Sequence, residues 1–121
     1  MPKNKILLID DSQTILNDIS RKLTDAGYEV IVQNKALGSS QIIINQKPDL
    51  VILDVNMPTF SGPDLLQTLR EGLPKLPPIL LFSEIDPKEL QKIASEKKAD
   101  DYLCKAEQSQ LISRIEKLLK K

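Results

Sequence analysis

Short apolar runs that alternate with segments of helical period constrain the fold of this chain more than any other feature. The first, third and fourth runs are apolar at every position, which is typical of strands buried on both faces of a sheet. The second run follows Glu29, which indicates an edge strand. The five runs are Ile6 to Ile9, Val30 to Val32, Leu50 to Leu53, Ile79 to Phe82, and Tyr102 to Cys104.

Between these runs, apolar residues recur with the period of an amphipathic helix. The clearest stripes are Ile15, Ile19, Leu23 and Ala26, then Leu65, Leu66, Leu69 and Leu73, and finally Leu111, Ile112, Ile115, Leu118 and Leu119. Segments 35–46 and 87–98 have weaker stripes. Five alternations of strand and helix predict a doubly wound α/β fold with five helices around a five-stranded parallel sheet. The general rule for this flavodoxin-like architecture gives the strand order 2-1-3-4-5.

Composition excludes several classes of function. The chain has 121 residues, 17 Lys and Arg against 17 Asp and Glu, no histidine and one cysteine. The charge balance gives no electrostatic reason to expect nucleic acid or an anionic membrane as a partner. Without histidine there is no Ser-His-Asp triad and no His-metal site. Residues 1–5 lead directly into the first apolar run with no signal peptide, so we expect a cytoplasmic protein without a membrane partner.

Polar residues stand at the carboxyl ends of four of the predicted strands. Asp10 and Asp11 follow the first strand, Asp54 the third, Ser83 the fourth and Lys105 the fifth. Taken singly, each has an ordinary explanation as a helix cap, a turn residue or a solvated side chain. Taken together, they are expected to line one crevice, because the first and third strands are neighbours at the topological switch point.

Three carboxylates brought together repel one another unless a cation offsets their charge. Oxygen ligands with room for water suit Mg²⁺, and Mn²⁺ accepts the same ligands. A carboxylate beside such an ion, with a lysine ammonium nearby, can attack a phosphoryl group. These residues therefore predict an aspartyl phosphate as the product.

The sequence resembles the receiver domain of two-component response regulators, of the single-domain chemotaxis-regulator type. The resemblance covers residues 1–121 as a single domain. It is carried by the apolar run into Asp10 and Asp11, the segment 48–58 (PDLVILDVNMP) with Gly62, the segment 79–83 (ILLFS) and the segment 101–105 (DYLCK).

The resemblance implies a role for each residue of the crevice. Asp54 is the phosphoacceptor, and Asp11 and Asp54 hold Mg²⁺ directly. The backbone carbonyl of Asn56 completes the metal site, while Asp10 acts largely through water.

The resemblance also implies a switch. Ser83 donates its hydroxyl to the phosphoryl group, Lys105 pairs with it, and Tyr102 is the aromatic residue that turns inward when the hydroxyl residue moves.

Three positions depart from the family pattern and are expected to tune the site. Ala106 stands where the family usually has a proline in a cis peptide, which leaves the loop that aims Lys105 unspecified. Glu84 replaces a small residue next to Ser83, and we expect it to point to solvent. Ile85 replaces a residue that is often polar, and we hypothesise that it shields the acyl phosphate from water.

We therefore expect a stand-alone receiver that takes a phosphoryl group from a sensor histidine kinase or a phosphotransfer protein. It is expected to be a signalling switch rather than an enzyme, with its protein target at the face of the fourth helix, fifth strand and fifth helix.

Rival functions come from other classes. Glu84 and Ala106 favour the main alternative, a pseudo-receiver that binds its partner regardless of phosphorylation. A flavin binder is disfavoured because the loop after the first strand lacks glycine. An aspartate-based phosphohydrolase is disfavoured because Asn56 replaces its second acid.

Overall fold

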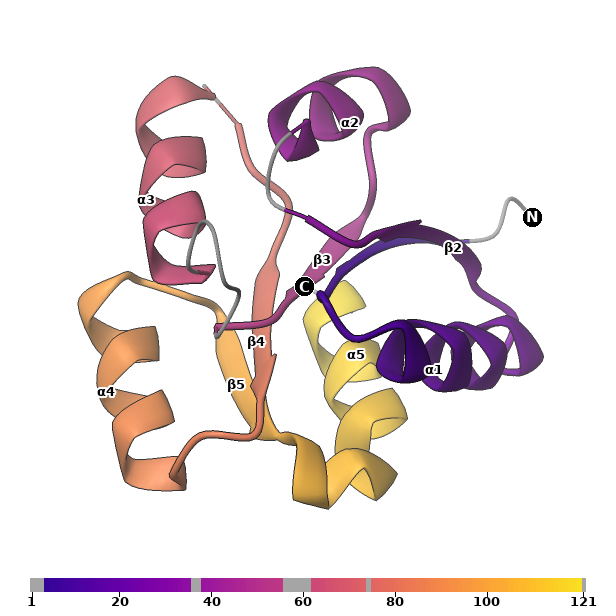
Figure 1. Cartoon of the computed structure of the whole chain (residues 1–121). Coiled ribbons are helices and arrows are strands. Elements are labelled where there is room, and N and C mark those ends of the chain that lie inside the picture. The colour runs from indigo at the N-terminus through magenta and orange to yellow at the C-terminus, as the bar shows by residue number, and fades with distance from the viewer. Residues whose placement is uncertain (1–3, 36–37, 56–61, 74, 121) are drawn as a thin grey trace.

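The computed structural model describes residues 4–35, 38–55, 62–73 and 75–120. Its strands and helices alternate along the chain (Figure 1). The strands are β1 (Lys5–Ile9), β2 (Glu29–Gln33), β3 (Leu50–Leu53), β4 (Ile79–Ser83) and β5 (Asp101–Cys104). The helices are α1 (Gln13–Asp25), α2 (Ser39–Gln46), α3 (Gly62–Gly72), α4 (Pro87–Glu96), the 3₁₀ helix η1 (Lys105–Gln110) and α5 (Leu111–Leu119).

The strands form one parallel sheet in the order β2-β1-β3-β4-β5, which confirms the predicted topology. In this sheet, Ile9 of β1 pairs with Leu53 of β3, and Ser83 of β4 pairs with Cys104 of β5. Strand β2 lies at an edge, as Glu29 indicated, and its residues are only partly covered. The register therefore brings the residues that follow β1 and β3 to the same end of the sheet.

Two hydrophobic clusters cover the two faces of the sheet. Apolar side chains of α1 and α5 pack against one face, and those of α2, α3 and α4 pack against the other, in agreement with the layers in Figure 1. Strands β1, β3 and β4 contribute alternate residues to the two clusters, because successive side chains of a strand point to opposite faces. Among the described residues, no helix is both long enough and apolar enough to span a membrane.

The helices differ from the predicted stripes in three places. In α1, Leu16 is in the core at 2% exposure, whereas Ala26 is exposed and lies beyond the end of the helix. Helix α2 begins only at Ser39, after Gly38 at φ 90°, a left-handed conformation that glycine adopts without steric cost. The 3₁₀ helix η1 was not predicted, and it joins β5 to α5 directly after the strand.

Candidate phosphoacceptor and metal site

The end of the sheet where β1 and β3 finish gathers the predicted acidic residues. The backbone N–H of Asp54 donates to the carbonyl of Ile9 at 3.0 Å, so the ladder between the two strands continues into the site. On the other side of β1, the N–H of Asp10 donates to the carbonyl of Gln33 at 3.1 Å. The two aspartates are therefore positioned by sheet hydrogen bonds rather than by a free loop.

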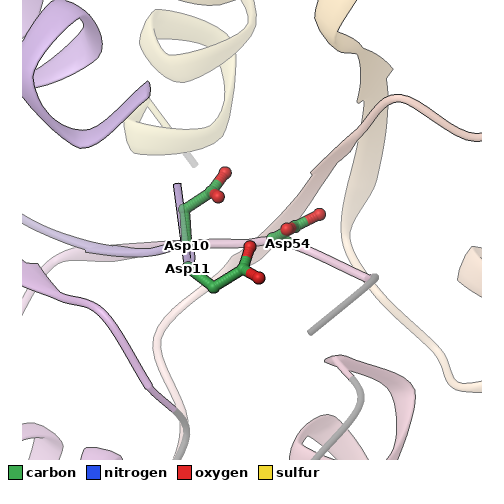
Figure 2. Close-up of side chains that lie close together, drawn as sticks. All are labelled: Asp10, Asp11 and Asp54. Atoms are coloured by element: carbon green, nitrogen blue, oxygen red, sulfur yellow. The ribbon is translucent and has the colours of Figure 1, made fainter. Parts of the chain in front are cut away.

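Three carboxylates meet at this edge. Asp10, Asp11 and Asp54 each offer one oxygen, and these oxygens all lie within 4.8 Å of one another (Figure 2). Asp10 and Asp54 are buried, at 1% and 4% exposure, whereas Asp11 is exposed. The donor set consists only of carboxylate oxygens, which fits a hard divalent ion such as Mg²⁺ with part of its water shell retained.

Lys105 compensates part of this negative charge. Its Nζ lies 2.7 Å from Oδ2 of Asp10 and 3.7 Å from Oδ2 of Asp54, and its side chain is only 8% exposed. The Lys105–Ala106 peptide bond is trans, like every other peptide bond of the described residues. The lysine thus reaches the carboxylates although Ala106 takes the place of a proline.

The carboxylate of Asp10 contacts two groups of the protein. Its Oδ1 accepts a hydrogen bond from the N–H of Ser12 at 2.9 Å, and its Oδ2 pairs with Lys105. Ser12 in turn caps α1, because its hydroxyl accepts from the N–H of Ile15 at 3.3 Å. In contrast to Asp10, the exposed Asp11 faces solvent, where a hydrated ion enters most easily.

A cavity of about 310 Å³ opens on the carboxylates. Its described lining consists of Asp11, Ser12, Asp54, Ser83, Glu84, Ile85 and Lys105. The hydroxyl of Ser83 lies in this wall, buried, and accepts a hydrogen bond from the N–H of Ile85 at 3.4 Å. Four of the five predicted crevice residues therefore line the cavity, and Asp10 lies behind it, paired with Lys105.

The remaining predicted residues lie around this cavity or outside the described chain. Glu84 is exposed and Ile85 is partly buried on the rim. Tyr102 is partly buried and packs on the hydrophobic cluster under α2, α3 and α4. It is not among the described residues that line the cavity. Ala106 is exposed beside a second cavity, and Asn56 lies outside the described residues.

The second cavity, of about 450 Å³, lies next to the first and shares Glu84, Ile85 and Lys105 with it. Cys104 and Gln108 also line it. Burial raises the pKa of the Cys104 thiol, and the carboxylates of Glu107 and Asp86 raise this pKa further. The thiol is therefore less reactive than a free cysteine, and Cys104 packs as a small apolar residue of the core.

Sequence reasoning overlooked two features of the site. The lysine was expected near a phosphoryl group, but its shortest contact is with Asp10 rather than Asp54. Gln108, whose side chain donates to the backbone carbonyl of Lys105 at 3.3 Å, was not identified at all. Its only signal in the sequence is its position three residues after the lysine.

Comparison with known proteins agrees with this geometry. The family "Response regulator receiver domain" matches residues 6–116. The chain is 31% identical over 118 residues to the response regulator MprA of Mycobacterium sp. strain KMS, which covers 97% of this chain and 51% of MprA. It is 37% identical over 100 residues to the transcriptional regulatory protein KdpE of Mycobacterium tuberculosis strain H37Rv, covering 83% of this chain and 43% of KdpE. The chain thus spans about half the length of these relatives.

Comparison with solved structures also indicates a receiver domain. The BeF3-activated receiver domain of RstA from Klebsiella pneumoniae superposes with a TM-score of 0.89 at 28% identity, covering 98% of this chain and 100% of that one. The chemotaxis protein CheY4 of Vibrio cholerae superposes with a TM-score of 0.87, also at 28% identity and with the same coverage. By its sequence, its sheet order and its acidic edge, the chain belongs to the response regulator receiver domain family.

Proposed function

We propose that Asp54 accepts a phosphoryl group from a sensor histidine kinase or a phosphotransfer protein, and that the phosphorylated chain signals to a protein partner. Receiver domains are phosphoacceptor signalling domains rather than classical enzymes. The observation that carries the proposal is that Asp54, Asp11, Ser83 and Lys105 line the same cavity. It brings a nucleophile, a hydroxyl donor and a cation to one small volume.

The proposed metal site uses the oxygens already gathered at the edge. Asp11 and Asp54 would hold Mg²⁺ or Mn²⁺ directly, and Asp10 would act largely through water. The carbonyl of Asn56, outside the described residues, would be a further ligand. When bound, the ion offsets the negative charge of the carboxylates and of the phosphoryl oxygens.

The chain's own residues supply the remaining chemistry. A carboxylate oxygen of Asp54 forms the new bond to phosphorus, and the bond from phosphorus to the donor nitrogen breaks, with its electron pair leaving on the donor. Lys105, 3.7 Å from Asp54, is placed to neutralise the transferred oxygens, and the Ser83 hydroxyl to donate to one of them. Asp54 is 4% exposed, so water and the phosphodonor both approach it through the cavity.

The negative charge added by phosphorylation of Asp54 is proposed to change the conformation of the elements that follow β4 and β5. Phosphorylation adds roughly two negative charges, which draw Ser83 and Lys105 away from their present partners. Because Ser83 ends β4 and Lys105 follows β5, the face of α4, β5 and α5 would rearrange with them, and Tyr102 on β5 would change its packing. This face is the proposed docking site of the protein target.

The proposal covers this chain acting as a receiver in the cytoplasm. The charge balance of this chain gives no information on a nucleic-acid partner of a longer protein, because the relative KdpE is a transcriptional regulator and is about twice as long as the matched region.

Intact mass after incubation with acetyl phosphate tests the proposal. We expect one phosphoryl adduct on the wild type in Mg²⁺, none in EDTA, and none on Asp54→Asn. Asp25→Asn is the matched control, because it removes an exposed aspartate at the end of α1 and is expected to leave the adduct intact. An adduct of equal yield on Asp54→Asn would contradict the assignment.

The exposed Glu84 on the cavity rim favours one alternative, a binding module that acts without phosphorylation. That alternative predicts no adduct with acetyl phosphate or a phosphorylated kinase and no binding of Mg²⁺. Isothermal titration with Mg²⁺ and the adduct measurement together distinguish the two functions.

A further inference from the structure

The turn that carries Lys105 is held by something other than a proline. Ala106 follows the lysine and does not fix the backbone dihedral angle φ as proline would. Nevertheless, Lys105 is 7% exposed and its Nζ is within 2.7 Å of Asp10. A long side chain with several rotatable bonds reaches such a position reproducibly only if its backbone is fixed.

The backbone of η1 does not provide this constraint by itself. Glu107 has φ −107° and ψ 30°, outside the helical range, so η1 is interrupted two residues after Lys105. A 3₁₀ helix also has poorer hydrogen-bond geometry than an α-helix. A side-chain contact from η1 to another element would therefore add to the constraint on the turn.

We propose that Gln108 is the positioning residue that fixes the Lys105 turn to α1. Its Nε2 donates to the backbone carbonyl of Lys105 at 3.3 Å, and its Oε1 accepts from Nζ of Lys22 on α1 at 2.5 Å. One glutamine thus uses both ends of its amide to join the turn to the helix. The proposal gains its functional meaning from the role proposed above for Lys105.

Helix α1 is a firm anchor for this contact. Its residues Leu16, Ile19 and Leu23 are at most 2% exposed and pack in the same cluster as side chains of α5. Lys22 precedes one of these buried positions, so its backbone is next to the part of α1 that packs in the core. In Figure 1, α1 and α5 lie on the same side of the sheet.

The same helix also holds the partner of the lysine. Ser12, the N-cap of α1, donates its backbone N–H to Asp10 at 2.9 Å. Asp10 is thus connected to the start of α1, and Lys105 is connected to its last turn through Gln108 and Lys22. Both members of the buried ion pair therefore have a hydrogen-bonded connection to α1.

Hydrogen exchange of the lysine side-chain ammonium, measured by ¹⁵N NMR on the metal-free, unphosphorylated protein, tests this inference. The Lys105 signal is assigned by its absence in Lys105→Met. The exchange rate of a protected group is proportional to the fraction of time in which it is open, so it reports how firmly Lys105 is held. This measurement does not depend on whether Asp54 accepts a phosphoryl group.

Two variants of Gln108 distinguish the two hydrogen bonds of its side-chain amide. Gln108→Ala removes both contacts. Gln108→Glu keeps an acceptor for Lys22 but cannot donate to the Lys105 carbonyl. Gln110→Ala is the matched control, because it removes a glutamine of the same 3₁₀ helix whose amide donates to Glu107 instead.

We expect slow exchange of Lys105 in the wild type and in Gln110→Ala, and exchange about two- to tenfold faster in Gln108→Ala and Gln108→Glu, the range set by one lost hydrogen bond. Urea unfolding of Gln108→Ala and Gln110→Ala is expected to be alike, which separates positioning from a general loss of stability. Equal exchange in Gln108→Ala and Gln110→Ala would overturn the inference. So would a wild-type Lys105 ammonium that exchanges as fast as those of exposed lysines, because nothing would then hold it.

Discussion

Replacing Lys105 with methionine tests how the three carboxylates are kept together. Methionine has a similar length but no charge, so Lys105→Met leaves Asp10 and Asp54 buried without their cation. At an effective dielectric constant of about 20, unit charges at the observed 2.7 Å and 3.7 Å attract by about 6 and about 4.5 kcal/mol. Desolvation offsets part of this attraction, and removing one partner of a buried pair costs about 3–5 kcal/mol.

We therefore expect Lys105→Met to lower the free energy of unfolding by about 3–5 kcal/mol in EDTA, a large share of the roughly 5–15 kcal/mol typical of a domain. Urea unfolding followed by circular dichroism measures this loss. Mg²⁺ is expected to stabilise the variant more than the wild type, because a divalent ion at the site supplies the charge that the lysine provided.

Lys92→Met is the matched control, since it makes the same chemical change at an exposed position of α4. Its expected effect is below about 0.5 kcal/mol. If Lys105→Met lost no more stability than Lys92→Met in EDTA, the reasoning from a buried, charged cluster would be wrong.

Three further predictions concern residues that line the second cavity, namely Ile85, Cys104 and Asp86. Ile85→Glu is expected to speed hydrolysis of the aspartyl phosphate, because an apolar wall of the cavity becomes polar. The decay rate of the phosphoryl adduct measures this effect, with Ile85→Val as the control. An unchanged decay rate in Ile85→Glu would contradict the shielding role. Because burial, then Glu107 and Asp86, raise the pKa of Cys104, iodoacetamide should modify the folded protein at pH 8 more slowly than the urea-unfolded protein. The folded state favours the protonated thiol of Cys104. The contribution of this thiol to the free energy of unfolding is therefore present below the ordinary thiol pKa and is lost as pH rises through the raised pKa. Equal alkylation rates of the folded and unfolded protein would contradict the raised pKa. Asp86→Ala removes the N-cap of α4, whose carboxylate accepts from two backbone amides at 3.0 and 3.3 Å, and should cost about 1 kcal/mol in urea unfolding, with Asp86→Asn nearly neutral.

The architecture was predictable from the sequence because its signals are local. A strand buried on both faces is apolar at every position, and β1, β3 and β4 are buried throughout almost their whole length. The residue that follows each strand then lies at the carboxyl edge whatever the details of packing. For this reason the sequence predicts that Asp54 and Ser83 line one crevice.

Periodicity was less informative about individual helix residues. It indicates a face, but neighbouring apolar residues on that face are not equivalent. In α1, Leu16 is fully in the core whereas Ile15 is only partly buried and lies at the edge of the cluster. The angle at which a helix crosses the sheet decides between them, and this angle is a property of the packed layers.

Sequence alone determined the order of the elements, the parallel sheet and the edge at which the acidic and hydroxyl side chains gather, because each follows from local periodicity and from the rules of chain connection. The tertiary structure decided which charges pair: Lys105 contacts Asp10 more closely than Asp54, and Gln108 connects its turn to Lys22. These partners are 95 and 86 residues apart in the chain. No local pattern encodes such distances, since they are fixed only when the two layers of helices close on the sheet.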